Sequence, residues 1–169
     1  MDADLAFADW AAARQRRLVR AAYLMTGDLP LAEDLVQEAL VKVCQRWERL
    51  RDGRPEAYAR TILYRDHATW WRRRREYAVA EVRDDRPVVP GSVEDADVVR
   101  AALLRLPGKQ RAVLVLRYFE DLSVAEAAEV LGVSPGTVKS QTHDALRNLR
   151  DQAPELRALV GLDDAEVTS

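Results

Sequence analysis

The sequence predicts an all-α protein of two small helical domains joined by a flexible linker, the C-terminal domain containing a helix-turn-helix. Ala, Arg, Leu and Glu, which dominate the 169 residues, favour helices, and no segment shows the period-two alternation of a strand. Apolar residues instead recur at spacings of three and four. Between residues 78 and 97 this pattern stops, and prolines, a glycine and acidic clusters replace it, which is typical of a linker.

The N-terminal domain, residues 1–77, is expected to contain three main helices. The first runs from about Leu5 to Thr26, and Gly27 can supply the left-handed residue that ends it. The second begins near Pro30, and Pro55 suits the first turn of the third, which continues through EAYARTILYRDHATWWRRRREY. The second helix and the residues after it carry an apolar stripe that should face a core: Leu31, Leu35, Ala39, Val43, Trp47 and Leu50.

The C-terminal domain, residues 98–152, belongs to a helical block that should start near Glu94. Pro107-Gly108, the stretch EDLS, Gly132 and Pro135-Gly136 divide this block into four helices. The remaining residues, 153–169, form an acidic tail that can add a short helix.

The helix-turn-helix is predicted by the segment SVAEAAEVLGVSPGTVKSQTHDALRNLR. Ser123 is a good N-cap, and Glu126 follows three residues later, as in a capping box. Gly132 can end this helix with Val133 filling the turn, and Ser134 can cap the next helix. Apolar residues give the two helices their inner faces: Ala127, Ala128, Leu131, Val138, Ala145, Leu146 and Leu149.

The second helix of such a motif enters the DNA major groove, so its exposed N-terminal residues are candidates for DNA contact. Lys139 and Arg147 can neutralise phosphates, while Ser140 and Gln141 can reach base edges. A helical hairpin with a polar surface is the alternative. The candidate residues are Ser134, Pro135, Gly136, Thr137, Lys139, Ser140, Gln141, His143 and Arg147.

The stretch ATWWRRRREY places two tryptophans directly before four arginines. Aromatic faces for stacking beside dense positive charge suit single-stranded nucleic acid, although a core tryptophan followed by a solvated helix end would have the same composition.

The net charge of −2 conceals segments of opposite net charge. Residues 1–80 carry 15 basic and 12 acidic side chains, whereas residues 81–98 carry 2 and 6.

Several classes of protein are disfavoured. No apolar run approaches the roughly 18 residues that span a bilayer, so no membrane insertion is expected. The acidic N-terminus is unlike a signal peptide, which indicates a cytoplasmic protein. One cysteine and two histidines predict neither internal disulfides nor a metal site. There is no phosphate-binding glycine loop and no nucleophile motif, so neither an enzyme nor a cofactor is expected.

Three segments, in order, resemble the extracytoplasmic-function (ECF) sigma factors of the sigma-70 superfamily, and most closely their actinobacterial SigE-like subgroup. LPGKQRAVLVLRYFEDLSVAEAAEVLGVSPGTVKS is similar to the domain that binds the −35 promoter element. AEDLVQEALVKVCQRW resembles the helix that docks on the polymerase clamp, and ARTILYRDHATWWRRRRE resembles the promoter-melting segment. The resemblance spans residues 5–150. It implies a sigma factor that directs core RNA polymerase to specific promoters and begins DNA opening.

The resemblance also implies residue roles and partners. Region 2 would occupy residues 1–77 and region 4 residues 98–152. The partners would be core polymerase, through its clamp coiled coil and flap, promoter DNA as duplex and as nontemplate strand, and in some members an anti-sigma factor. Residues for −10 recognition and melting would be Arg65, His67, Trp70, Trp71, Arg72, Arg73, Arg74 and Arg75. Those for polymerase docking would be Glu33, Asp34, Leu35, Gln37, Glu38 and Lys42.

Four points stay open at this level. Arg65 stands where many family members have asparagine and cannot copy the paired donor and acceptor of an amide, so the −10 preference is undetermined. Trp70 and Trp71 point about 100° apart on a helix, and we expect Trp71 to pack inward. Cys44 is expected to be a small packed hydrophobe rather than a redox sensor. The acidic linker either mimics a nucleic-acid strand or simply keeps itself extended.

The main alternative is a conventional transcription regulator with a C-terminal helix-turn-helix and an N-terminal ligand or dimer domain. Such a protein would bind a two-fold-symmetric operator tightly by itself and would have no use for the Trp-Trp-Arg segment. A sigma factor should bind DNA weakly alone, because each domain makes few phosphate contacts and a flexible linker leaves their spacing unset.

Overall fold

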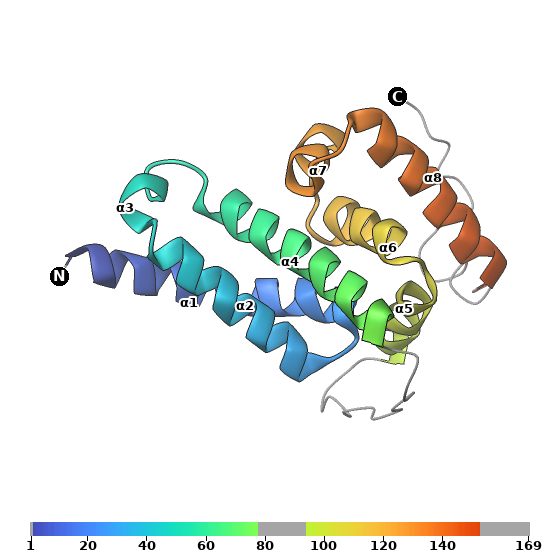
Figure 1. The fold of residues 1–169 in the computed structure, drawn as a ribbon, viewed down its shortest axis with the longest axis horizontal. Coiled ribbons are helices and arrows are strands. Elements are labelled where there is room, and N and C mark those ends of the chain that lie inside the picture. The colour runs from blue at the N-terminus through green and yellow to red at the C-terminus, as the bar shows by residue number, and fades with distance from the viewer. Residues whose placement is uncertain (1, 78–93, 153–169) are drawn as a thin grey trace.

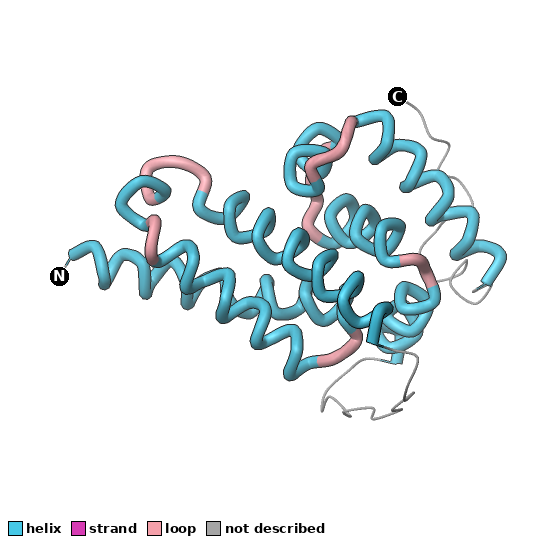
Figure 2. The backbone as a smooth tube through the Cα atoms, viewed as in Figure 1, coloured by secondary structure: helices cyan, strands magenta, loops and turns pink. Residues whose placement is uncertain are grey.

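The computed structural model describes the backbone of residues 2–77 and 94–152 and the side chains of residues 4–66 and 98–152. In these ranges every regular element is helical (Figure 2). The N-terminal domain comprises α1 (Asp2–Thr26), α2 (Leu29–Cys44), the short α3 (Trp47–Leu50) and α4 (Pro55–Tyr77). The C-terminal domain comprises α5 (Glu94–Arg105), α6 (Gly108–Leu114), a π-helical segment (Val115–Phe119), α7 (Val124–Leu131) and α8 (Pro135–Gln152).

The N-terminal domain is a bundle in which α2 packs against both α1 and α4 (Figure 1). Gly27 ends α1 with φ 70°, and Asp28 caps α2 by accepting the Leu31 N–H at 3.0 Å, so the predicted helix boundary is confirmed. Of the predicted stripe, Leu31 and Leu50 are only partly buried and the other four members lie in the core. Near the start of α1, the rings of Phe7 and Trp10 pack together with the ring of Trp47, the first residue of α3.

The C-terminal domain contains the predicted helix-turn-helix. Ser123 and Glu126 form the capping box of α7, and Gly132 ends that helix with φ 67°. Val138, Ala145, Leu146 and Leu149 form the buried stripe of α8, as predicted. Val133 was expected to fill the turn, but this residue is 41% exposed, and the turn is closed by a backbone bond in which the Val133 N–H donates to the Ala128 carbonyl.

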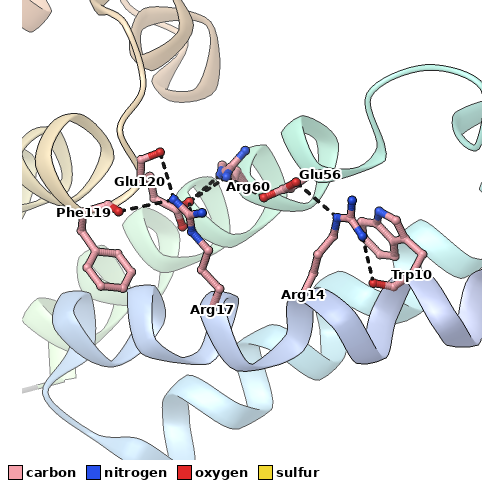
Figure 3. Close-up of polar contacts among 7 residues, drawn as sticks. All are labelled: Trp10, Arg14, Arg17, Glu56, Arg60, Phe119 and Glu120. Atoms are coloured by element: carbon pink, nitrogen blue, oxygen red, sulfur yellow. Dashed lines mark hydrogen bonds and ion pairs between the residues drawn. The ribbon is translucent and has the colours of Figure 1, made fainter.

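The π-helical segment was not predicted. It directly continues α6, and its last turn is closed by the Glu120 N–H bonding to the Val115 carbonyl. Asp121 follows with φ 58°, which reverses the chain toward α7. The effect is to aim the Glu120 side chain away from its own domain and toward α1 and α4 (Figure 3).

The two domains pack against each other. α5 packs against the C-terminal end of α1, α7 packs against α4, and the buried apolar side chains of both domains form one continuous core. Leu104 of α5 covers the end of α1 so closely that a β-carbon on Gly27 would lie 2.7 Å from its Cδ1 atom. The all-α fold of two helical domains is as predicted, but no sequence pattern indicates this contact between them.

Two further predictions are tested by the structure. The second helical block begins at Glu94, as expected, so the last four residues of the predicted 78–97 linker are helical; residues 78–93 and the tail 153–169 lie outside the described residues. Cys44 is exposed, which corrects the expectation of a packed side chain. In the described ranges no helix is long and apolar enough to cross a membrane, and no cluster of potential metal ligands occurs.

Candidate functional site

The start of α8 presents a polar face to solvent. Ser134 caps the helix, its Oγ accepting the Thr137 N–H at 3.1 Å. The N-terminus of a helix carries partial positive charge and open N–H groups, and Lys139 adds a full charge beside it. All of the residues predicted for −35 contact are exposed except Gln141, which is half-buried: Ser134, Pro135, Gly136, Thr137, Lys139, Ser140, His143 and Arg147.

One feature of this face was not predicted. The Arg147 guanidinium pairs with Asp144, Nη2 to Oδ1 at 3.1 Å, so a phosphate must compete with a carboxylate for it. In the preceding helix, the bond of the predicted capping box, in which the Glu126 carboxylate accepts the Ser123 N–H at 2.8 Å, holds the pKa of Glu126 below its usual value. The i,i+3 spacing of 144 and 147 is a local signal that could have identified the ion pair.

The predicted −10 and melting residues all lie on α4. Arg65 is exposed, and its Nη2 atom lies 3.3 Å from the position of a β-carbon built on Gly132, the turn of the helix-turn-helix. Asp66 pairs with Lys42 of α2 at 2.6 Å. The side chains of the other candidates lie outside the described residues, so the orientation of the two tryptophans stays a prediction: His67, Trp70, Trp71, Arg72, Arg73, Arg74 and Arg75.

Most of the residues predicted to form the docking face of α2 are exposed to solvent. Glu33, Asp34, Gln37 and Glu38 are exposed. Leu35, only 8% exposed, packs in the core and can orient the helix but cannot touch a partner in this arrangement.

Two other α2 side chains depart from the predicted face. Lys42 is engaged with Asp66 rather than free. Val41, 53% exposed, joins the same face, and its position three and four residues after Glu38 and Gln37 is the sequence signal that could have found it.

A buried charge cluster joins the two domains (Figure 3). The Glu120 side chain, 0% exposed, accepts from Arg60 of α4, whose Nε and Nη2 lie 2.9 and 2.7 Å from Oε2. Arg17 of α1 approaches the same oxygen at 3.5 Å and donates to the Glu120 carbonyl at 3.3 Å. Arg60 also pairs with Glu56 at 2.6 Å, and Glu56 in turn with Arg14 at 3.3 Å.

A second buried arginine, Arg111 of α6, holds the ends of two helices. Its guanidinium donates to the carbonyls of Leu103, Leu104 and Leu106 at 2.9, 3.1 and 3.1 Å, and across the domain contact to the Met25 carbonyl. Burial lowers the pKa of Arg111 from 12.5 to about 10. These carbonyls lie at or just after the C-terminal ends of α5 and α1, where a helix leaves acceptors without intrahelical donors, and Arg111 supplies donors to them.

The comparisons with known proteins agree with this organisation. Residues 11–77 match the family model of sigma-70 region 2, and residues 96–149 match that of sigma-70 region 4. The RNA polymerase sigma-E factor of Streptomyces coelicolor is 38% identical over 152 residues, covering 88% of this chain and 86% of that protein. The ECF RNA polymerase sigma factor SigW of Bacillus subtilis is 30% identical over 175 residues, covering 89% and 90%.

Among solved structures, the sigma factor RpoE of Bartonella quintana, crystallised with the anti-sigma factor NepR, superposes with a TM-score of 0.70 at 26% identity, covering 86% of this chain and 94% of that one. Both family regions are therefore present in the order and at the positions of the two helical domains. The chain belongs to the sigma-70 family as an ECF sigma factor of the SigE-like subgroup, a promoter-specificity factor of RNA polymerase.

Proposed function

We propose that the chain divides promoter recognition among three surfaces: α2 docks on core polymerase, α4 engages the −10 region, and α8 reads the −35 element. The observation that carries this proposal is the exposed N-terminal face of α8, which no described part of the chain covers. A helix-turn-helix in region 4 with its second helix open to solvent has the geometry needed to enter a major groove.

At the −35 element, the start of α8 would lie in the groove with its N–H groups and Lys139 toward phosphates. Ser140 and Gln141 would reach base edges, Gln141 as the amide that can pair with adenine. Arg147 would exchange Asp144 for a phosphate, a switch between two charge-assisted bonds. Region 4 would also contact the polymerase flap.

At the −10 region, α4 would hold the nontemplate strand. Stacking on an aromatic side chain stabilises an unstacked base by about 1–3 kcal/mol, and the arginines that follow Trp70 and Trp71 in the sequence would track the backbone. Arg65 would contact a phosphate or stack on a base, in place of the amide readout that an asparagine allows.

At the polymerase, the acidic and amide face of α2 would dock on the clamp coiled coil. Opposite charge speeds encounter and selects orientation, while Val41 at the C-terminal end of the face adds an apolar contact. Leu35 would act from the core by fixing the rotation of α2, and Lys42 by tying α2 to α4 through Asp66.

Members of this family are DNA-binding initiation factors, and we expect the chain itself to carry out no covalent chemistry. Its work would take place with polymerase and chromosome, in the cytoplasm. An anti-sigma factor is a further proposed partner, supported by the B. quintana relative, which was crystallised with one. The conventional regulator is not favoured, because region 2 occupies the place of its ligand or dimer domain.

Run-off transcription with sigma-free core polymerase on a library of bacterial promoter fragments tests the proposal. We expect defined start sites that depend on the chain and share two sequence elements upstream. Transcripts without a shared element, or tight binding of the chain alone to a palindromic duplex, would contradict it and favour the regulator.

A further inference from the structure

The contact between the domains is centred on the Glu120 carboxylate, and both arginines that pair with it belong to the other domain. Glu120 follows the π-helical segment of region 4, whereas Arg17 and Arg60 belong to α1 and α4 of region 2 (Figure 3). A fully buried carboxylate is stable only while it is paired and hydrogen-bonded. Removing its charge should therefore weaken the contact between the domains more than it weakens either domain.

The charges around Glu120 also permit the contact to open. Arg60 has a second partner, Glu56, within its own domain, so separating the domains leaves Arg60 paired and returns Glu120 to water. In the packed form the Glu120 Oε1 atom and the nearby buried Tyr64 hydroxyl have no hydrogen-bond partner among the described residues. Opening removes this penalty, which offsets part of the loss of the apolar contact between the two domains.

The packed form places the two DNA surfaces too close together for a promoter. Arg65 lies against Gly132, and Gly132 precedes Pro135, the first residue of α8, by three residues, which is at most about 11 Å of chain. The −10 and −35 positions are roughly 25 base pairs apart, or about 85 Å along duplex DNA. The domains must therefore separate before both elements can be bound. The 17 residue steps from Tyr77 to Glu94 can span up to about 60 Å, and the lengths of α4 and α8, about 34 and about 27 Å, add to the reach of the separated domains.

We propose that Glu120, with Arg17 and Arg60, is an ionic latch that holds the free chain closed and unable to engage a promoter until a partner separates the domains. This inference rests on the proposed function for the identity of the DNA surfaces, but the latch itself is a property of the chain alone. Because only the open fraction can bind, the apparent affinity for polymerase and promoter is reduced by that fraction.

The test compares substitutions that remove an ion pair between the domains with substitutions that remove an ion pair inside one domain. Glu120→Gln and Arg17→Gln each remove a contact that crosses the domain boundary, whereas Glu56→Gln and Arg14→Gln remove one inside region 2. Arg17 is half-exposed on α1, so its substitution should leave helix packing intact. Circular dichroism confirms folding, and energy transfer between dyes on Cys44 and on an introduced Asp151→Cys reports the separation of the domains.

We expect Glu120→Gln and Arg17→Gln to lower energy transfer and to shift the closed-to-open ratio toward open by roughly tenfold or more. Arg14→Gln should match the wild type, and Glu56→Gln, which removes the partner that Arg60 keeps when the domains separate, should open no further than the wild type. Small-angle scattering on the unlabelled chains should show the same two groups. Folded Glu120→Gln and Arg17→Gln chains with wild-type transfer and radius would overturn the latch.

Titration of unlabelled chains with core polymerase separates the latch from the proposed function. We expect the two latch variants to bind more tightly than wild type by the factor by which their open fraction rises. Latch variants that open while no chain binds polymerase would refute the proposed function and leave the latch standing. Latch variants that open but bind polymerase with wild-type affinity would show that opening does not limit binding, which contradicts the regulatory role.

Discussion

Replacing Arg111 by methionine should destabilise the protein by about 3 kcal/mol. The guanidinium donates to four carbonyls at or just after the C-terminal ends of α5 and α1. At about 1.5 kcal/mol for each bond from a charged donor, these contribute roughly 6 kcal/mol. Burial opposes this gain: lowering the pKa from 12.5 to about 10 corresponds to a penalty of about 3 kcal/mol. Methionine restores the aliphatic packing but leaves the carbonyls without these bonds.

Urea unfolding followed by circular dichroism measures this loss, with Arg105→Met as the matched control. Arg105 is exposed and donates to the Gln152 carbonyl at 2.8 Å, so its replacement should lower the free energy of unfolding by less than about 1 kcal/mol. If Arg111→Met and Arg105→Met lost the same stability, the interpretation of Arg111 as a buried cap for two helix ends would be wrong.

The remaining predictions concern Tyr64, the capping box and the DNA-reading helix. Burial, with the Glu120 charge, raises the pKa of Tyr64 well above 10.0, so its stabilising contribution is complete below about pH 10 and is lost as the pH rises further. Tyr64→Phe should therefore lose less stability than wild type as the pH is raised above about 10 in thermal melts. Ser123→Ala removes the N-cap of α7 and should lower the melting temperature by about 2–4 °C, for a loss near 1 kcal/mol, measured by calorimetry. In promoter binding with polymerase, Lys139→Ala should reduce the slope of log affinity against log salt by about 1 for every sequence. Gln141→Ala should instead weaken binding to the preferred −35 sequence by about 1–3 kcal/mol and relax preference at one base.

Each of these has a contrary outcome. Equal alkaline losses in Tyr64→Phe and wild type would mean that Tyr64 ionises as freely as in the unfolded chain. An unchanged melting temperature in Ser123→Ala would mean that water replaces the cap at no loss. A sequence-specific effect of Lys139→Ala, or a uniform effect of Gln141→Ala, would reverse the roles assigned to these two side chains.

The sequence predicted features that depend on neighbouring residues. The cap at Ser123, the left-handed stops at Gly27 and Gly132 and the buried stripe of α8 follow from local chemistry, and all are present. The outward face of α2 was found for the same reason, since a helix shows its periodicity in a single segment.

Features that depend on distant packing were not predicted. Arg60 and Glu120 are 60 residues apart, and nothing in either local sequence distinguishes them from solvated charges. In the sequence Arg111 has the features of an exposed helix residue, and it is buried only because the ends of α1 and α5 pack beside it in the fold. Cys44 was misjudged because its neighbour Val43 is in the core, while one step along a helix turns a side chain by about 100° toward solvent.

Binding to sigma-free core polymerase tests most directly whether the chain works as proposed. The measurement is co-elution on size exclusion of core polymerase with the wild type and with the double variant Asp34→Lys, Glu38→Lys. A second double variant, Asp4→Lys and Asp9→Lys, makes the same charge change at exposed positions of α1 and serves as the control. We predict that wild type and control co-elute with polymerase and that the α2 variant does not. A wild-type chain that elutes apart from polymerase, or an α2 variant that still co-elutes, would contradict docking through α2.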